Sequence, residues 1–334
     1  MTENSRPEWT GRTDGPGPEH ARWHSTVRAR TLDDLSRDAR PEADGSGRPK
    51  RAVDLIGFAS DAGVARNNGR VGAASGPGEL RKGLSSLAVH EPLEVTDFGD
   101  VVVKDDAGLE PGQDRLSAAV ADSVARGAVP CVLGGGHETA WGTFRGIREG
   151  LRARDDAEGR TGRSTLGILN LDQHFDLRRE ERPTSGTPFL QIAELLESED
   201  EAFRYGIVGI SEPNNTAVGF ETAREHGARW LLDEECTRET AVKFARGLLD
   251  SVDSLYMTLD LDVLPASAAP GVSAPAAYGV GVDVIRAVML EAARSGKLAG
   301  FDVVELNPVY DVDSRTAKCA ARLINDVVRA VSGT

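Results

Sequence analysis

The chain has 334 residues, a formal net charge of −14 and 28% charged residues, which suits one large α/β domain or two small ones. This acidity argues against a protein that binds the phosphate backbone of nucleic acids, because the sequence offers no basic stripe. Its apolar runs are too short for a transmembrane helix or a secretory signal, so neither is expected.

The first 50 residues differ in composition from the rest. They hold nine basic and nine acidic residues but only three Ile, Leu, Val or Phe residues. Such a composition predicts an N-terminal extension over residues 1–50 that is partly ordered or flexible. Trp9 and Trp23 indicate that part of this extension lies on the surface of the main domain, which is expected to span residues 51–334.

From residue 51 onward, short runs rich in Val, Ile and Leu alternate with amphipathic stretches. Apolar runs without polar alternation are typical of strands covered on both faces, so the pattern predicts an α/β fold with a parallel sheet between helices. Strands are expected at Ala52–Phe58, Leu93–Phe98, Val129–Leu133, Thr165–Leu171, Arg204–Ile210, Ser254–Leu259 and Gly300–Glu305. Helices are expected at Arg115–Arg126, Glu239–Ser251, Asp283–Ser295 and Arg315–Val331. Residues 151–164 and 265–280 are expected as loops.

Three polar clusters each follow directly after one of these apolar runs. They are Gly134–Glu138, Asp172–Asp176 and Asp260–Asp262. Ligands of parallel sheets gather outside the carboxyl ends of the strands, so the clusters lie where a binding site is expected.

The spacing within the clusters has a physical meaning. Side chains at positions i, i+2 and i+4 of an extended segment face the same way. Asp172, His174 and Asp176 are therefore expected to converge on one side, and so are Asp260 and Asp262.

Together with His137, these side chains offer four carboxylates and two imidazoles. Crowding four carboxylates without cations costs free energy, and six ligands exceed what one small cation needs. A mixed carboxylate and imidazole set favours a pair of Mn²⁺ ions, which can share a water molecule and lower its pKa. Each cluster alone is more often a turn, a cap or a hydrogen-bonded core histidine; their occurrence at successive strand ends favours a metal centre.

These motifs, in this order and at these separations, resemble the arginase/agmatinase (ureohydrolase) family. Gly69–Gly72 with Gly76-Pro77 is similar to its N-terminal glycine motif, and Glu305–Pro308 to its late Glu-x-Asn-Pro. The resemblance runs from about residue 8 to residue 325. It implies a three-layer α/β/α sandwich and assembly into trimers or hexamers. It also implies two Mn²⁺ ions per subunit, held by His137, Asp172, His174, Asp176, Asp260 and Asp262.

Within the family, His174–Arg178, Ser185–Phe189 and Asp262–Ala277 resemble the formimidoylglutamases most. Ser185 stands where arginases and agmatinases have a histidine proposed to shuttle protons, so Asp176, water or another group not identified from the sequence would transfer the proton here. Gln173, which replaces the alanine of most relatives, is expected to point away from the metals.

The resemblance also implies roles for the substrate contacts. Glu305 matches the carboxylate that holds the cationic C–N group of the substrate. Arg178 can clamp a carboxylate bidentately, and N-formimidoyl-L-glutamate carries two. Thr184, Ser185 and Asn215 are further candidates for hydrogen bonds to the substrate.

The expected activity is hydrolysis of a carbon–nitrogen bond in a linear amidine, giving L-glutamate and formamide in histidine degradation, with Asp176 and Glu305 as catalytic residues. Two alternatives stay open: an agmatinase or guanidino-acid hydrolase that releases urea, and a metal-binding scaffold without activity. The odd, widely spaced cysteines favour the cytoplasm. The expected partners are a small-molecule substrate and further copies of the chain, with neither nucleic acid nor membrane.

Overall fold

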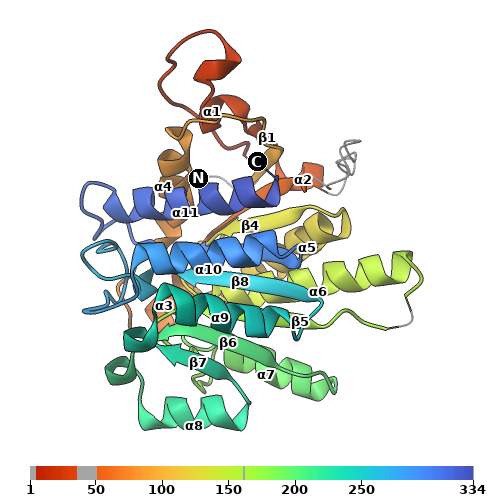
Figure 1. The fold of residues 1–334 in the computed structure, drawn as a ribbon, viewed down its shortest axis with the longest axis vertical. Coiled ribbons are helices and arrows are strands. Elements are labelled where there is room, and N and C mark those ends of the chain that lie inside the picture. Colours follow the sequence, from red (N-terminus) through yellow and green to blue (C-terminus); the bar gives the residue numbers. More distant parts are fainter. Residues whose placement is uncertain (1–4, 36–50, 161, 334) are drawn as a thin grey trace.

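The computed structural model describes residues 5–35, 51–160 and 162–333 of the chain. Within these residues, nine strands form one sheet in which all neighbouring strands are parallel (Figure 1). The strands, in sheet order, are β1 (Arg28–Ala29), β3 (Val95–Val102), β2 (Val53–Ala59), β4 (Val129–Leu133), β9 (Leu298–Val304), β8 (Ser254–Asp260), β5 (Leu166–Leu171), β6 (Arg204–Ile210) and β7 (Arg229–Leu232). All seven predicted strands are present, and the two strands at the edges, β1 and β7, were not predicted.

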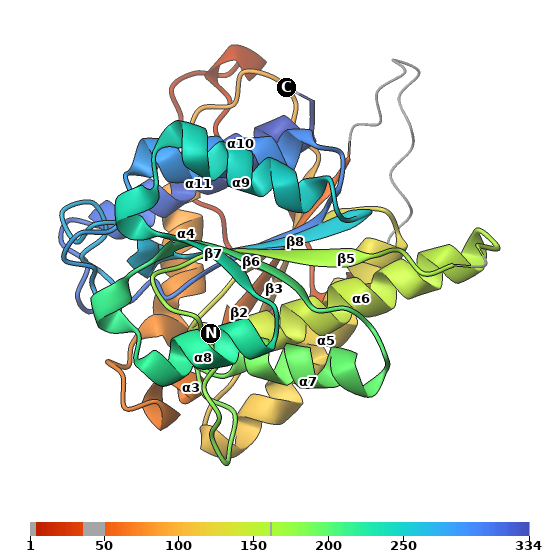
Figure 2. The same ribbon diagram turned by 60° about the horizontal axis from the view of Figure 1, so that its bottom comes forward.

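Helices cover both faces of the sheet, so the three-layer α/β/α sandwich is confirmed (Figure 2). One layer holds α4 (Gly76–Ser85), α9 (Arg238–Leu249), α10 (Val282–Arg294) and α11 (Arg315–Val331). The other holds α5 (Leu109–Ala125), α6 (Thr139–Ala157), α7 (Pro188–Ser198) and α8 (Ala217–Glu225). The shorter helices are α1 (Trp23–Thr26), α2 (Leu32–Leu35) and α3 (Ala62–Arg66).

The hydrophobic core consists of two layers, one on each face of the sheet. Successive residues of a strand enter opposite layers: in β4, Cys131 joins the layer under α9–α11, and Val132 joins the layer under α5–α7. This explains why the central strands are apolar throughout in the sequence. Cys131 is fully buried, as expected of a small core residue.

One loop prediction was wrong in part. Residues 151–157 belong to α6, although the sequence there is strongly charged. Leu151 and Asp155 are buried on the inner face of this helix, whereas Arg152 pairs with Glu199 and Glu201 at its surface. The charges thus mark the outer face of a long helix rather than a loop. Residues 265–280 do form a long loop that contains only an isolated bridge.

The described part of the N-terminal extension packs onto the sheet and onto α11. Trp23 is fully buried, and its indole Nε1 donates a hydrogen bond to Asn325 Oδ1 over 2.9 Å. Trp9 stacks on Trp23 and donates to Asp97 Oδ2 over 2.8 Å. Residues 5–35 are therefore anchored by both tryptophans, while the rest of the predicted extension lies outside the described residues.

None of the described helices is both long enough and apolar enough to cross a membrane. The three cysteines are free thiols.

Candidate metal centre

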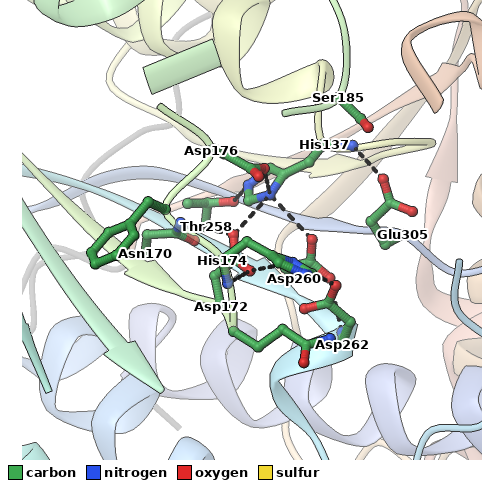
Figure 3. A network of polar contacts seen from close by, with 12 residues as sticks. His137, Asn170, Asp172, His174, Asp176, Ser185, Thr258, Asp260, Asp262 and Glu305 are labelled. Carbon is green, nitrogen blue, oxygen red and sulfur yellow. Dashed lines mark hydrogen bonds and ion pairs between the residues drawn. The ribbon is translucent and has the colours of Figure 1, made fainter. Parts of the chain in front are cut away.

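Four strands in the middle of the sheet, β4, β9, β8 and β5, are neighbours and deliver polar residues at their carboxyl ends. In that strand order, the residues are His137, Glu305, Asp260, Asp262, Asp172, His174 and Asp176. Figure 3 shows these side chains pointing toward one another from different strands. The parallel topology thus brings together segments that are far apart in the sequence.

The first group of potential ligands surrounds the imidazole of His137. One ligand atom each of His137, Asp172 and Asp176 lies within 4.8 Å of the others. His137 Nδ1 is 3.2 Å from Asp172 Oδ2, 3.0 Å from Asp176 Oδ2 and 3.1 Å from Asp260 Oδ2. One imidazole nitrogen therefore faces three carboxylates.

A second group consists of Asp172, His174 and Asp262, with ligand atoms again within 4.8 Å of one another. His174 Nδ1 lies 3.2 Å from Asp262 Oδ2 and 3.5 Å from Asp172 Oδ1. Asp172 belongs to both groups, so one of its oxygens faces each histidine. Two neighbouring sites that share a carboxylate are the arrangement expected of a binuclear centre.

Contacts on the side of His137 away from the carboxylates fix its orientation. Its Nε2 lies 3.0 Å from Thr258 Oγ1, and its backbone N–H donates to Glu305 Oε1 over 2.8 Å (Figure 3). With Nε2 occupied by the hydroxyl, Nδ1 is left to face the carboxylates. Such outer contacts set the tautomer and the ring plane of a ligating histidine.

Burial and charge crowding shift the pKa values of the cluster strongly. Burial raises the pKa of Glu305 to about 8, with a further contribution from the nearby Glu138 carboxylate, and raises that of Asp260 well above its usual range. Burial alone would lower the pKa of His137, but hydrogen bonds to three carboxylates outweigh it and raise that pKa well above normal. The cluster therefore concentrates buried carboxylates whose negative charge must be offset by cations or protons.

Two carboxylate oxygens of the cluster also lack a hydrogen-bond partner. Among the described residues, Asp262 Oδ1 and Glu305 Oε2 are buried and accept no hydrogen bond. A buried carboxylate oxygen without a partner costs free energy unless a cation or a ligand satisfies it. The donor set of four carboxylates and two imidazoles therefore fits divalent cations.

Asp176 and Glu305 both have left-handed backbone conformations, with φ of 48° and 67°. Such values are uncommon for residues with a side chain and cost free energy, and they concentrate at functional sites. At Glu305 the chain turns directly after β9, and at Asp176 it turns after the ligand candidates Asp172 and His174.

A cavity of about 270 Å³ opens at this cluster. Ligand sites of drug size span roughly 300–1,000 Å³, so this cavity suits a small polar molecule. Of the predicted substrate contacts, Arg178, Ser185 and Glu305 line it together with all the metal-ligand candidates except Asp172.

Thr184 and Asn215 do not line the cavity. Asn215 Nδ2 donates to the carbonyls of Gln173 and Ser211, and Asn215 Oδ1 accepts from the Phe175 N–H. The Thr184 hydroxyl accepts a hydrogen bond from the N–H of Gly186. Both side chains thus bind the backbone of the loops around the site, and their role as substrate contacts stays a prediction.

Gln173 turns toward a loop, in line with the expectation that it points away from the cluster. Its Nε2 donates to the Ala274 carbonyl over 2.5 Å, and its Oε1 accepts from Asn214. This residue ties residues 265–280, which form one wall of the cavity, to the end of β5.

The sequence did not reveal Asn67 and Arg70 as cavity residues, although both line it. Asn67 binds Ser185 Oγ and Arg178 Nη1, each over 3.0 Å. Arg70 lies inside the glycine motif Gly69–Gly72. Its place in the loop region after the first central strand was the signal that could have found it.

Comparison with known proteins extends over nearly the whole chain. Residues 51–329 match the arginase family. The formimidoylglutamase of Rhodococcus jostii is 49% identical over 325 residues, covering 96% of this chain and 95% of its own. That of Nocardia farcinica is 48% identical over 322 residues, or 96% of each chain. The structure of Trypanosoma cruzi formiminoglutamase with Mn²⁺ has a TM-score of 0.74 at 26% identity, covering 90% of this chain and 98% of that chain.

Proposed function

The chain belongs to the arginase family of hydrolases, and from that premise we propose that it is a formimidoylglutamase that converts N-formimidoyl-L-glutamate and water to L-glutamate and formamide in histidine degradation. The observation that carries the proposal is the pair of ligand groups that share Asp172, at a cavity lined by Arg178 and Ser185. A histidine at position 185 would have favoured arginase or agmatinase chemistry, and this chain has none there.

We assign the metals as two Mn²⁺ ions. They would be held by His137, Asp172, His174, Asp176, Asp260 and Asp262. The oxygen-rich set with two imidazoles suits Mn²⁺, and the Trypanosoma cruzi formiminoglutamase structure contains Mn²⁺. When bound, such a pair supplies Lewis-acid chemistry that activates water as a nucleophile near neutral pH.

Glu305 would hold the amidinium of the substrate. Its Oε1 is fixed by the His137 N–H at 2.8 Å, which leaves the buried Oε2 free to accept an N–H of the substrate. A cationic amidinium beside this carboxylate would favour its charged form against the effect of burial.

Arg178 and Asp176 complete the assignment. Arg178 has a guanidinium that is fixed at one end by Asn67 and can bind a substrate carboxylate at the other. Asp176 lines the cavity with its Oδ2 3.0 Å from His137 Nδ1, and it would pass a proton to the leaving nitrogen. Assembly into trimers or hexamers and a cytoplasmic location remain predictions from the family resemblance and the free cysteines.

Product analysis tests the function directly. The full chain with added Mn²⁺ is expected to release formamide and L-glutamate in equal amounts, and Asp172→Ala or His174→Ala should abolish turnover. Release of ammonia with N-formylglutamate would place the cleavage at the other C–N bond. Urea release from guanidino acids without turnover of N-formimidoyl-L-glutamate would contradict the proposal.

A further inference from the structure

Two arginines, Arg70 and Arg178, line the cavity, and across the described parts of the chain neither forms an ion pair with a carboxylate. Arg66, on the same segment as Arg70, behaves differently: it pairs with Asp106 and Glu110 at 2.6 and 2.7 Å and does not line the cavity. In a protein of net charge −14, guanidiniums without carboxylate partners are available to an anionic ligand.

The guanidinium of Arg70 is held from three sides. Its Nε donates to the Ser273 carbonyl over 2.8 Å, its Nη2 donates to the Val272 carbonyl over 2.5 Å, and its central carbon lies 4.0 Å from the centre of the Tyr310 ring. These bonds use two of the five N–H donors of an arginine. The remaining donors are therefore fixed in direction, and binding an anion would cost little side-chain freedom.

Arg178 is held by a different segment. Its Nη1 donates to Asn67 Oδ1 over 3.0 Å, and its backbone N–H donates to the Gly186 carbonyl over 2.9 Å. Arg70 is fixed by residues 272–273 instead. The two guanidiniums are thus positioned independently around one cavity, which suits a ligand with two separate carboxylates.

Building on the proposed amidine hydrolysis, we propose that Arg70 is a second specificity-determining residue, which binds one carboxylate of the substrate while Arg178 binds the other. The site then selects an amidine that carries two carboxylates. An amidine with a single carboxylate leaves one guanidinium without its anion and binds more weakly.

Substrates that lack one carboxylate test this assignment. The full chain with Mn²⁺ would be assayed on N-formimidoyl-L-glutamate, on N-formimidoyl-γ-aminobutyrate, which lacks the α-carboxylate, and on N-formimidoyl-L-α-aminobutyrate, which lacks the γ-carboxylate. The wild type is expected to prefer the dicarboxylate by roughly 10- to 100-fold in kcat/KM. Arg70→Gln should lose the preference for the dicarboxylate over one of the truncated substrates, mainly through a higher KM. Arg178→Gln should lose the preference over the other truncated substrate.

Two further variants make the result interpretable. Arg70→Lys keeps the charge without the planar fork and should retain part of the preference. Arg179→Gln removes an exposed arginine that pairs with Glu194 and should leave all three values of kcat/KM unchanged. If Arg70→Gln lowers all three equally, as a residue that only holds the 272–273 loop would, or changes none of them, the proposal is overturned.

A binding measurement separates this inference from the proposed function. Calorimetry would compare L-glutamate, γ-aminobutyrate and L-α-aminobutyrate on the Mn²⁺-treated chain. If the wild type hydrolyses none of the amidines, the proposed function fails, yet tighter binding of glutamate that is lost in Arg70→Gln still supports the role of Arg70. Equal affinity of the wild type for all three amino acids overturns it, even if the Arg70 variants do not fold.

Discussion

Glu305 combines three features that rarely occur in one structural residue. Its carboxylate is buried, one of its oxygens accepts no hydrogen bond from the described residues, and its φ is 67°. Each feature costs free energy, and no hydrogen bond from the described residues offsets the burial of Oε2. A cationic ligand would offset it, which is the role assigned to the amidinium.

Glu305→Gln isolates the charge of this side chain. The amide keeps the size and can still accept the His137 N–H, but it cannot pair with an amidinium. Removing one partner of a buried charge pair costs about 2–5 kcal/mol, so kcat/KM should fall at least about 30-fold. Manganese content measured by elemental analysis should not change, because Glu305 is not among the proposed ligands. A value of kcat/KM close to that of the wild type would refute the role.

Gly135 is required by a close approach of two backbones. A Cβ at this position would lie 1.8 Å from the Ser60 carbonyl oxygen, and the Gly135 carbonyl also accepts the Glu305 N–H over 2.7 Å. Gly135→Ala must therefore displace the loop that carries His137. We expect a loss of about 1–3 kcal/mol in the free energy of unfolding and a lower manganese content. Denaturant unfolding and elemental analysis would measure both.

Gly162→Ala is the matched control, because an added Cβ there meets no atom within 4 Å. Its stability and metal content should equal those of the wild type. If Gly135→Ala behaves in the same way, the close approach to Ser60 does not hold the loop.

The metal-ligand candidates could be predicted from the sequence because they depend on local spacing at the ends of buried strands. The rim of the cavity could not. Asn67 and Ser185 are 118 positions apart and meet only through the packing of two loops. The same packing brings the Asn215 amide into hydrogen bonds with the backbone carbonyls of Gln173 and Ser211.

Among the elements, strand prediction succeeded where both faces are covered and failed at the edges. β7 is only half-buried, and β1 has two residues, so neither shows a continuous apolar run. The last turns of α6 were predicted as a loop because they carry charges that pair at the surface, and no helix was predicted over the rest of α6. The N-terminal extension shows the converse: a segment of polar composition can be anchored by two tryptophan rings, of which Trp23 is fully buried.

The ion pairs that fix the end of α6 predict a pH dependence. The hydrogen bond from Arg148, with another from Arg152, lowers the pKa of Glu199 from 4.5 to about 2. Folding therefore favours the charged carboxylate. Its contribution to stability is fully present above pH 4.5 and is lost as the pH falls toward about 2.

Glu199→Gln should therefore lower the free energy of unfolding near neutral pH, and the difference from the wild type should vanish in that acidic range. The effect should stay below about 1 kcal/mol, because the ion pair is partly exposed to solvent. Glu197→Gln, on the exposed face of α7, serves as the control. A difference that is constant with pH, measured by denaturant titration, would contradict the shift.

For the whole molecule, the sheet order is the feature that creates the site. β4, β9, β8 and β5 become neighbours although other elements separate them in the chain, and their carboxyl ends meet at one edge. Part of the net charge of −14 is thereby concentrated in one buried cluster. The fold must hold these carboxylates together, so its stability should depend on the cations that offset them.

Metal removal tests that dependence on the intact chain. Cations that bind only the folded state stabilise it by an amount that grows with their concentration, about 2.7 kcal/mol at a hundredfold excess over Kd. Calorimetric scans should therefore show a lower Tm in chelator and a Tm that rises with added Mn²⁺.

Asp172→Asn provides the decisive comparison, because Asp172 belongs to both ligand groups. Its amide removes the shared negative charge at nearly constant volume. The variant should therefore gain little in Tm from added Mn²⁺, in contrast to the wild type. If the wild-type Tm is the same with chelator and with Mn²⁺, the cluster is stable without cations, and the charge argument for a binuclear centre fails.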